Sequence, residues 1–474
     1  MKYLSTRGQA PQLGFEDALL EGLARDGGLY VPSAWPTLSP DEWSDLRGRH
    51  YADLAVRVMW PFVQDAIERD AFERIVCEAY SKFRHQAVAP LVQIAPSLWV
   101  MELFHGPTLA FKDVAMQVLG GLFDHVLAKR DERLTIVGAT SGDTGGAAIE
   151  AIAGRDRADI FILHPKGRTS DVQRKQMTTV HADNVHNLAV HGTFDDCQAL
   201  VKAMFNDGPF RDRLHLSGVN SINWARVMPQ AGYYVAAAAQ LGALSGGPAP
   251  KFSVPTGNFG DIYAGYIAHK MGLPIGRLIV ASNSNDILTR VFNTGDHTLG
   301  DVHATTSPSM DIQVSSNFER LLYDVLDQDA LRVAELMAKL KSDRTFKLDA
   351  DAVAKLAEHF SAYRATEPEV HATMKTVYER TSYLLDPHTA VGVHAAEQEM
   401  LKTGDRATPM VVLATAHPAK FPDAVEAATG VRPPLPDFLA DLYEREERYD
   451  EVADDLAAVE AMIEGRAAVA SNPR

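Results

Sequence analysis

The chain has 474 residues, which is enough for two or three domains that share a sizeable core. Its 62 Asp and Glu residues outnumber its 46 Lys and Arg residues, and the formal net charge is −16 at pH 7. This acidity argues against a nucleic acid or an anionic membrane as the main partner. A small anionic ligand would therefore need local positive groups.

The two cysteines, Cys77 and Cys197, lie far apart and form no CxxC pattern. They predict neither a disulfide framework nor a zinc ribbon, and we expect no metal site. The residues after Met1 are polar and do not look like a signal peptide, and no apolar stretch reaches ~18 residues. We expect a cytoplasmic protein that does not enter a membrane.

Two regions follow each other along most of the chain. Residues 1–88 have a mostly helical pattern with a turn at Gly27 and Gly28, and we expect a small N-terminal domain there. In residues 89–425, short apolar runs alternate with amphipathic stretches, which is typical of βαβ units. We expect parallel strands covered by helices, with ligands at the carboxyl ends of the strands. The predicted strands are Leu134–Thr140, Asp159–His164, Val185–His191, Phe252–Pro255, Leu278–Ala281 and Met410–Thr415.

The βαβ rhythm is lost at about residues 296–370, where we expect an inserted subdomain. Its predicted helices are Phe318–Lys341 and Ala350–Arg364. Residues 426–474 form an acidic tail, in which we predict a helix over Asp437–Glu464.

Lys112 follows a turn at Gly106 and Pro107, and an apolar helical face begins next to it. Thr108 is a candidate helix cap. A helix start and apolar neighbours such as Phe111 disfavour the ammonium form, which lowers the pKa of a lysine and frees its amine to attack a carbonyl. A Schiff-base lysine needs these properties. The alternative is a surface lysine on an amphipathic helix, which is the commoner role of a lysine.

Two glycine-rich turns, Ser141-Gly-Asp-Thr-Gly-Gly146 and Gly257-Asn-Phe-Gly-Asp261, each lie between a predicted strand and a predicted helix. Backbone amides at a helix start can hold a phosphate or a carboxylate. If both turns follow strands of one sheet, they could hold the anionic ends of two ligands that lie together in the crevice. Asp261 would repel a phosphate, so we expect its carboxylate to turn away and cap the helix.

Four segments together resemble threonine synthases of the long, bacterial and fungal type: His105-Gly-Pro-Thr-Leu-Ala-Phe-Lys-Asp, Ser141-Gly-Asp-Thr-Gly, Gly257-Asn-Phe-Gly-Asp and Thr415-Ala-His-Pro-Ala-Lys-Phe. Tyr3-Leu-Ser-Thr-Arg-Gly and Asp26-Gly-Gly-Leu-Tyr-Val-Pro also match, so the likeness covers nearly the whole chain. The resemblance implies an α/β, fold type II pyridoxal-phosphate enzyme, similar to the tryptophan synthase β chain, with parallel helix-covered sheets, a small N-terminal domain and an inserted subdomain.

The resemblance also implies roles for single residues. Lys112 matches the family's Schiff-base lysine, and Thr415 matches the partner of the pyridine nitrogen. A hydroxyl there leaves the nitrogen largely unprotonated, which suits elimination better than transamination. Asp143 stands where related enzymes commonly carry Asn, near the ring hydroxyl. The implied cofactor-phosphate loop is Gly257, Asn258, Phe259, Gly260 and Asp261, and the implied substrate-carboxylate turn is Ser141, Gly142, Asp143 and Thr144.

The substrate phosphate needs donors beyond these loops. Ser221, Asn223 and Arg226 combine a hydroxyl, an amide and a guanidinium, which suit bidentate phosphate binding. The segment that ends at Arg320 offers the same groups, although either arginine could be an ordinary surface residue. We expect His388 to be a packed loop histidine.

The resemblance implies that the chain converts O-phospho-L-homoserine and water to L-threonine and phosphate through an aldimine of pyridoxal 5'-phosphate, the last step of threonine biosynthesis. This makes it a carbon–oxygen lyase acting on phosphates (EC 4.2.3.1). We expect a monomer or a homodimer with no nucleic-acid partner. Two alternatives remain: a phospholyase or a serine or threonine dehydratase on the same fold, and a non-catalytic anion-binding relative.

Overall fold

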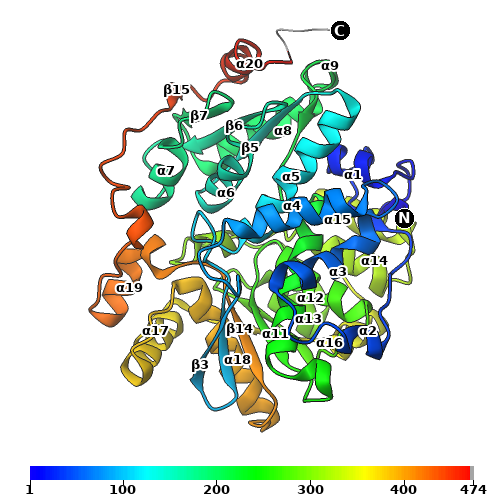
Figure 1. The fold of residues 1–474 in the computed structure, drawn as a ribbon, viewed down its shortest axis with the longest axis vertical. Coiled ribbons are helices and arrows are strands. Elements are labelled where there is room, and N and C mark those ends of the chain that lie inside the picture. The colour runs from blue at the N-terminus through cyan, green and yellow to red at the C-terminus, as the bar shows by residue number, and fades with distance from the viewer. Residues whose placement is uncertain (470–474) are drawn as a thin grey trace.

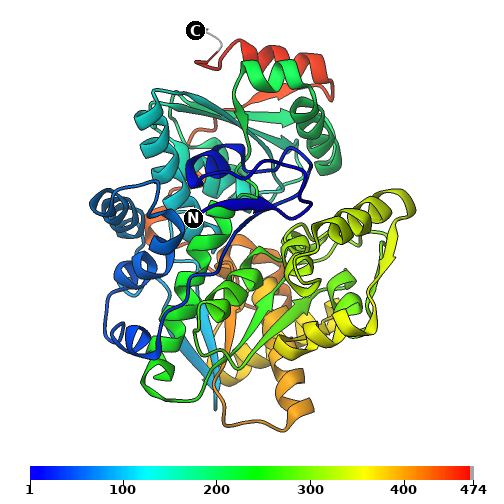
Figure 2. The same cartoon turned by 90° about the vertical axis from the view of Figure 1, so that its right-hand side faces the viewer.

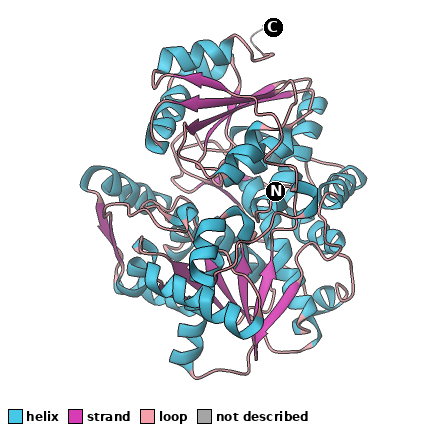
Figure 3. Cartoon of the chain, turned by 90° about the vertical axis from the view of Figure 1, so that its left-hand side faces the viewer, coloured by secondary structure: helices cyan, strands magenta, loops and turns pink. Residues whose placement is uncertain are grey.

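Two β-sheets organise the protein, whose computed structural model describes residues 1–469. One sheet has five strands and the other has six, and they lie in the upper and lower parts of the molecule in Figures 1 and 3. Helices pack against both sheets. The expected α/β fold with parallel, helix-covered sheets is therefore confirmed. Within residues 1–469, no helix combines the length and apolar character needed to cross a bilayer.

The five-stranded sheet is parallel throughout, in the order β15-β7-β6-β5-β8. Side chains alternate between its faces, so that Ile136 and Ile160 join the core with α5 and α6, whereas Val137 and Phe161 join the core with α8 and α20. Its strands are β5 (Leu134–Ala139), β6 (Ala158–Pro165), β7 (Val185–Val190), β8 (Leu216–Ser217) and β15 (Asp450–Val452). Its helices are α5 (Lys112–Arg130), α6 (Asp143–Ile152), α7 (Asp171–Thr178), α8 (Phe194–Asn206), α9 (Gly208–Arg213) and α20 (Leu456–Glu464).

The six-stranded sheet has the order β13-β10-β9-β14-β4-β3, and only β3 runs antiparallel to its neighbour. Phe252 and Val254 face α11 and α12, and Val412 faces α17 and α18. Its strands are β3 (Leu91–Ala95), β4 (Leu98–Glu102), β9 (Lys251–Pro255), β10 (Arg277–Ser282), β13 (Phe360–Arg364) and β14 (Met410–Ala414). Its helices are α10 (Trp224–Val227), α11 (Ala231–Gln240), α12 (Gly260–Lys270), α13 (Ile287–Thr294), α17 (Glu367–Thr381), α18 (Pro387–Thr403) and α19 (Pro422–Thr429).

The N-terminal 88 residues contain four helices, but these cover fewer than half of the residues, so the prediction of a mostly helical region is only partly right, and the region also contains an antiparallel pair of strands. Each of these strands has three residues, which is too short for an alternating pattern to be recognised in the sequence. The helices lie along one side of the molecule in Figure 1. The elements are β1 (Tyr3–Ser5), α1 (Phe15–Glu21), β2 (Tyr30–Pro32), α2 (Pro40–Ser44), α3 (Tyr51–Val63) and α4 (Arg69–Ser81).

The region predicted as an insertion differs from expectation in two places. The helix predicted over Phe318–Lys341 is broken by Asp327 and Gln328, which both have positive φ. The helix predicted over Ala350–Arg364 ends early, and its last residues form β13, which pairs in parallel with β10. Figure 2 shows much of this region as an arm on the right. Its elements are β11 (Asp296–Thr298), α14 (Phe318–Val325), α15 (Ala330–Asp343), β12 (Thr345–Lys347) and α16 (Ala350–His359).

The prediction of one helix over Asp437–Glu464 is also mostly wrong. The tail contributes the edge strand β15 to the five-stranded sheet, and only its end forms the helix α20. Val452, Val459 and Ile463 are buried against this sheet and α8, which explains why tertiary packing overrides the helical pattern. Residues 470–474 of the predicted tail lie outside the described residues.

Candidate active site

Lys112 is the first residue of α5, and the loop before it is bound to the end of β14. The Phe111 N–H donates to the Thr415 carbonyl at 2.9 Å, and the His417 N–H donates to the Leu109 carbonyl at 3.0 Å. These bonds place Lys112 beside Thr415, at the carboxyl end of β14. The sequence predicted the helix start, although Thr108 is not its cap: its hydroxyl and N–H both donate to Asp113.

The Lys112 side chain is nearly buried, and its Nζ lies 3.4 Å from Oδ2 of Asp143. Burial lowers the pKa of Lys112, Asp143 opposes this effect, and the positive charges of Lys420 and Arg226 add to it. The direction of the shift agrees with the sequence analysis. Lys112 therefore loses its proton more easily than a lysine in water does.

The first glycine turn connects β5 to α6. The Thr140 hydroxyl accepts the N–H groups of Gly142 and Gly145, both at 2.9 Å, and Gly142 has a φ of 147° that favours glycine. Ser141 and Thr144 flank the helix start at Asp143. The turn thus presents the start of α6 toward Lys112.

The second glycine turn connects β9 to α12, so the two turns belong to different sheets. The expectation that both follow strands of one sheet is wrong, because β5 and β9 lie in separate sheets. Gly257 packs so tightly that an added Cβ would lie 2.7 Å from the Ser309 carbonyl. A Cβ on Gly260 would lie 3.7 Å from that of Ser221, which places Ser221 beside this loop.

Asp261 does not cap α12, so the expectation that it does is wrong. Its Oδ1 accepts hydrogen bonds from the hydroxyls of Tyr233 and Tyr234, the second at 3.2 Å. Burial raises the pKa of Asp261 to about 7, and the two tyrosine hydrogen bonds oppose the rise. A carboxyl that is partly protonated at neutral pH repels a phosphate less than a full charge does.

The two candidate arginines differ in their surroundings. Arg320 is fully buried and donates to the carbonyls of Tyr30 and Ile222 and to Asn317. Its donors therefore hold the protein together. Arg226 is also buried, but its Nε has no hydrogen-bond partner within the described residues, and burial lowers its pKa to about 10.

The other two residues of the predicted phosphate set also differ. The Asn223 side chain accepts from the Ala225 N–H and donates to the Leu19 carbonyl, so it caps α10. The Ser221 carbonyl accepts a hydrogen bond from the Asn317 side chain at 3.0 Å. The structure thus brings Ser221 to the glycine loop and uses Asn223 for the local fold.

These residues fit pyridoxal phosphate. Lys112 is a largely buried lysine with a depressed pKa, and Thr415 directly follows β14, the strand next to β9. In the loop after β9, the backbone at Gly257 lies where a side chain would not fit. The loop leads into the start of α12, and the backbone amides at a helix start favour binding of a phosphate. Neighbouring parallel strands end at the same edge of a sheet, so Thr415 and this loop lie close together.

Lys420 and Gln173 are site residues to which the sequence analysis gave no role. Lys420 is 1% exposed, and its Nζ lies 2.8 Å from Oδ1 of Asp143. Gln173 donates to the same oxygen at 2.8 Å. Lys420 belongs to the segment Thr415-Ala-His-Pro-Ala-Lys-Phe, so its place in that motif was the one feature of the sequence that pointed to it. Gln173 carried no signal.

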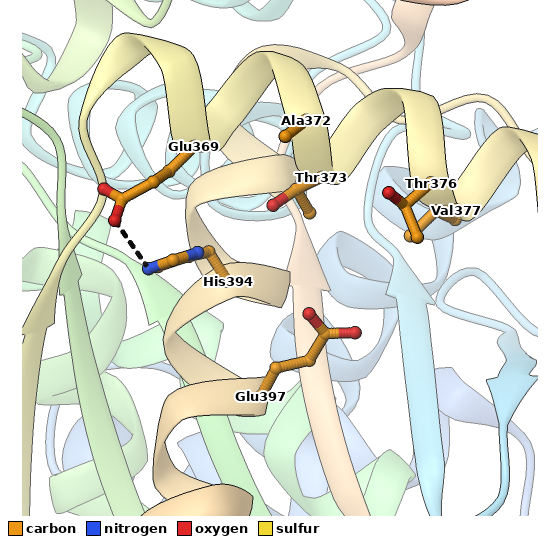
Figure 4. Close-up of a pocket in the computed structure, with 7 residues that line it drawn as sticks. All are labelled: Glu369, Ala372, Thr373, Thr376, Val377, His394 and Glu397. Atoms are coloured by element: carbon orange, nitrogen blue, oxygen red, sulfur yellow. Dashed lines mark ion pairs between the residues drawn. The ribbon is translucent and has the colours of Figure 1, made fainter.

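A groove of about 260 Å³ lies elsewhere, between α17 and α18 (Figure 4). Its ionic groups include Glu369 and His394, 4.0 Å apart. None of its lining residues belongs to the predicted site. His388 is buried as expected, with Nδ1 2.9 Å from Asp386, but it lies in the first turn of α18 and not in a loop.

The fold and the site define a pyridoxal-phosphate-dependent enzyme of fold type II, and the family model "Pyridoxal-phosphate dependent enzyme" matches residues 83–342. The models "Threonine synthase N terminus" and "Threonine synthase, C-terminal" match residues 2–80 and 389–463. The chain belongs to the threonine synthase family.

Similar proteins support this assignment along the whole chain. The threonine synthase of Pseudomonas aeruginosa is 52% identical over 464 residues, which cover 98% of each chain. The structure of the threonine synthase from Brucella melitensis with bound pyridoxal phosphate has a TM-score of 0.95 and 55% identity, covering 99% of this chain and 100% of that one. The yeast threonine synthase structure has a TM-score of 0.92 and 40% identity, covering 98% of each chain.

Proposed function

We propose that the chain converts O-phospho-L-homoserine and water to L-threonine and phosphate, with pyridoxal phosphate held by Lys112. One observation carries the proposal: Lys112 is a buried lysine with a depressed pKa, at a helix start between glycine turns from two sheets. Family membership supports the choice of substrate.

We assign the cofactor contacts as the sequence indicates. Lys112 would bind the cofactor's carbonyl carbon, the amides of residues 257–261 its phosphate, and the Thr415 hydroxyl its ring nitrogen. Asp143 would lie near the ring hydroxyl. When bound, pyridoxal phosphate is an electron sink that makes protons near the substrate amine acidic.

Lys112 moves the protons in this proposal. Its neutral amine accepts the α proton of the substrate, and loss of a β proton expels phosphate from the γ carbon. Lys112 then returns a proton at the γ carbon, water adds at the β carbon, and the return of a proton to the α carbon gives threonine. The burial of Lys112 supports this role. Burial disfavours the ammonium form and so favours the neutral amine, which is the form that accepts a proton.

The substrate's two anionic ends need separate partners. The turn formed by Ser141, Gly142, Asp143 and Thr144 starts α6 and suits the carboxylate. Arg226 and Ser221 suit the phosphate, because a buried guanidinium with an unpartnered Nε is stabilised by an anion. Asn223 supports them by capping the helix that carries Arg226.

Lys112→Ala tests the function. The wild-type protein should release phosphate and threonine in equal amounts, and the variant should lose both this turnover and the visible band of bound cofactor. Lys129→Ala is a matched control, since Lys129 is a half-exposed lysine on the same helix. Release of a keto acid and ammonia instead of threonine would indicate a phospholyase or a dehydratase, and a variant that kept band and turnover would refute the role of Lys112.

All the proposed site residues come from one chain, so we propose a monomer or a homodimer as the active unit. Light scattering during size-exclusion chromatography measures this directly. We also propose a cytoplasmic location, supported by two cysteines that are both free, Cys77 and Cys197. Cell fractionation tests that location.

A further inference from the structure

Lys420 is a second lysine buried beside Lys112. It ends the short 3-10 helix Pro418–Lys420, which follows β14. Its Nζ donates to the Thr108 carbonyl at 2.7 Å and lies 2.8 Å from Oδ1 of Asp143. A lysine is rarely buried unless it is paired, and these contacts account for its position.

Asp143 is shared unequally between the two lysines. Its Oδ1 lies 2.8 Å from Lys420, whereas its Oδ2 lies 3.4 Å from Lys112. Burial raises the pKa of Asp143, but the charges of Lys420 and Lys112 and the hydrogen bond from Gln173 outweigh burial and hold it well below its usual range. Asp143 is therefore a carboxylate whose closer partner is Lys420.

Four charged groups face Lys112 from other elements: Asp143 on α6, Lys420 after β14, Arg226 on α10 and Asp261 on α12. Asp143 favours the ammonium form of Lys112, and Lys420 and Arg226 disfavour it. If Lys420 were absent, the Asp143 carboxylate would act on Lys112 without its main counter-charge. Lys112 would then hold its proton more strongly.

We propose that Lys420 is a positioning residue that engages the Asp143 carboxylate, so that Lys112 keeps a neutral amine for the cofactor. It also fixes Asp143 relative to Thr108, in the loop that leads into Lys112. This inference rests on the proposed function, because it requires Lys112 to be the lysine that binds the cofactor.

The test measures how fast cofactor-free protein captures pyridoxal phosphate over a range of pH, since capture needs the neutral Lys112 amine. Lys420→Gln should move the midpoint of this pH profile upward by about 1 unit or more, which slows capture about 10-fold below the midpoint. Lys420→Arg, which keeps the charge, should stay near wild type. Asp143→Asn should move the midpoint downward, and Lys420→Gln combined with Asp143→Asn should lie between the two single variants.

Lys251→Gln is the matched control, because Lys251 pairs with Asp405 at 2.8 Å at the start of β9 and should not affect the midpoint. A Lys420→Gln midpoint equal to that of wild type overturns the inference. If Lys420→Gln does not fold, Lys420→Met, which also removes the charge, is compared with Lys420→Arg: equal midpoints overturn the inference.

The proposed function is tested separately by Lys112→Ala. If this variant loses the visible band while Lys420→Gln shows no shift, only the role of Lys420 fails. If Lys112→Ala captures the cofactor like wild type, both fail.

Discussion

Asp261 illustrates how burial changes a single residue. Its position in the glycine loop was predictable, because the turn residues that define the loop are local in the sequence. Its partners were not, because Tyr233 and Tyr234 lie on another helix, 28 and 27 residues away in the chain. Only packing of α11 against α12 brings these hydroxyls to the carboxyl.

Asp261→Asn should change how stability depends on pH. The pKa of Asp261 is raised by burial to about 7, against about 3.9 in an unfolded chain. Between these values only the folded protein holds the proton, so the wild type should lose stability relative to the variant as pH rises from about 4 to about 7. The upper bound is about 4 kcal/mol, at about 1.4 kcal/mol per pH unit. Denaturant unfolding of cofactor-free protein measures it.

Asp423→Asn is the control, because the Asp423 side chain is 90% exposed. It should show little change relative to wild type over the same range. A stability difference between wild type and Asp261→Asn that does not vary with pH would contradict a raised pKa for Asp261.

At the scale of elements, the loop between β9 and α12 depends on close backbone contact. An alanine at Gly257 would put its Cβ 2.7 Å from the Ser309 carbonyl, and backbone cannot move aside as a side chain can. We expect Gly257→Ala to weaken binding of pyridoxal phosphate at least about 10-fold, which corresponds to about 1.4 kcal/mol. Fluorescence titration measures the affinity.

Gly14→Ala is the matched control for this change. A Cβ at Gly14 meets nothing within 4 Å, and Gly14 has no positive φ. It should bind the cofactor like wild type. If Gly257→Ala does the same, the tight packing of the loop does not shape the phosphate site.

The tail is the other element that tertiary structure decides. Ile463 on α20 is fully buried against the five-stranded sheet and α8, so Ile463→Ala should lower the free energy of unfolding by about 2–5 kcal/mol. Leu331→Ala, at a leucine 67% exposed on α15, should change it by no more than about 0.5 kcal/mol. Thermal or denaturant unfolding compares them, and equal effects would show that α20 contributes little.

At the scale of the whole molecule, the site joins two sheets. Lys112 and Asp143 start helices of the five-stranded sheet, whereas Thr415 and the Gly257 loop follow strands of the six-stranded sheet. A ligand that touches both sides stabilises their arrangement. Pyridoxal phosphate at 100 times its Kd should therefore add about 2.7 kcal/mol to the stability of the folded state.

Calorimetry with and without pyridoxal phosphate measures this stabilisation. Lys112→Ala should lose most of it, because the bond to the lysine is the strongest contact we propose. An unchanged unfolding temperature in the wild type at this cofactor concentration would show that pyridoxal phosphate does not bind the folded state in preference to the unfolded chain.

The sequence by itself determined six strands of the two large sheets, the helix start at Lys112 and the two glycine turns. Each of these follows from local patterns: apolar periodicity, turn residues and helix signals within about ten residues. It also indicated the family, because the motifs occur in order along the chain.

Tertiary structure alone decided how these pieces meet. It divided the predicted strands between two sheets, made strands of Phe360–Arg364 and Asp450–Val452, and brought Lys420 to Asp143, 277 positions earlier in the chain. Pairing between distant segments depends on burial and charge that no local pattern contains. For this reason Lys112 could be recognised in the sequence, whereas Lys420, the closer counter-charge of Asp143, became visible only in the folded chain.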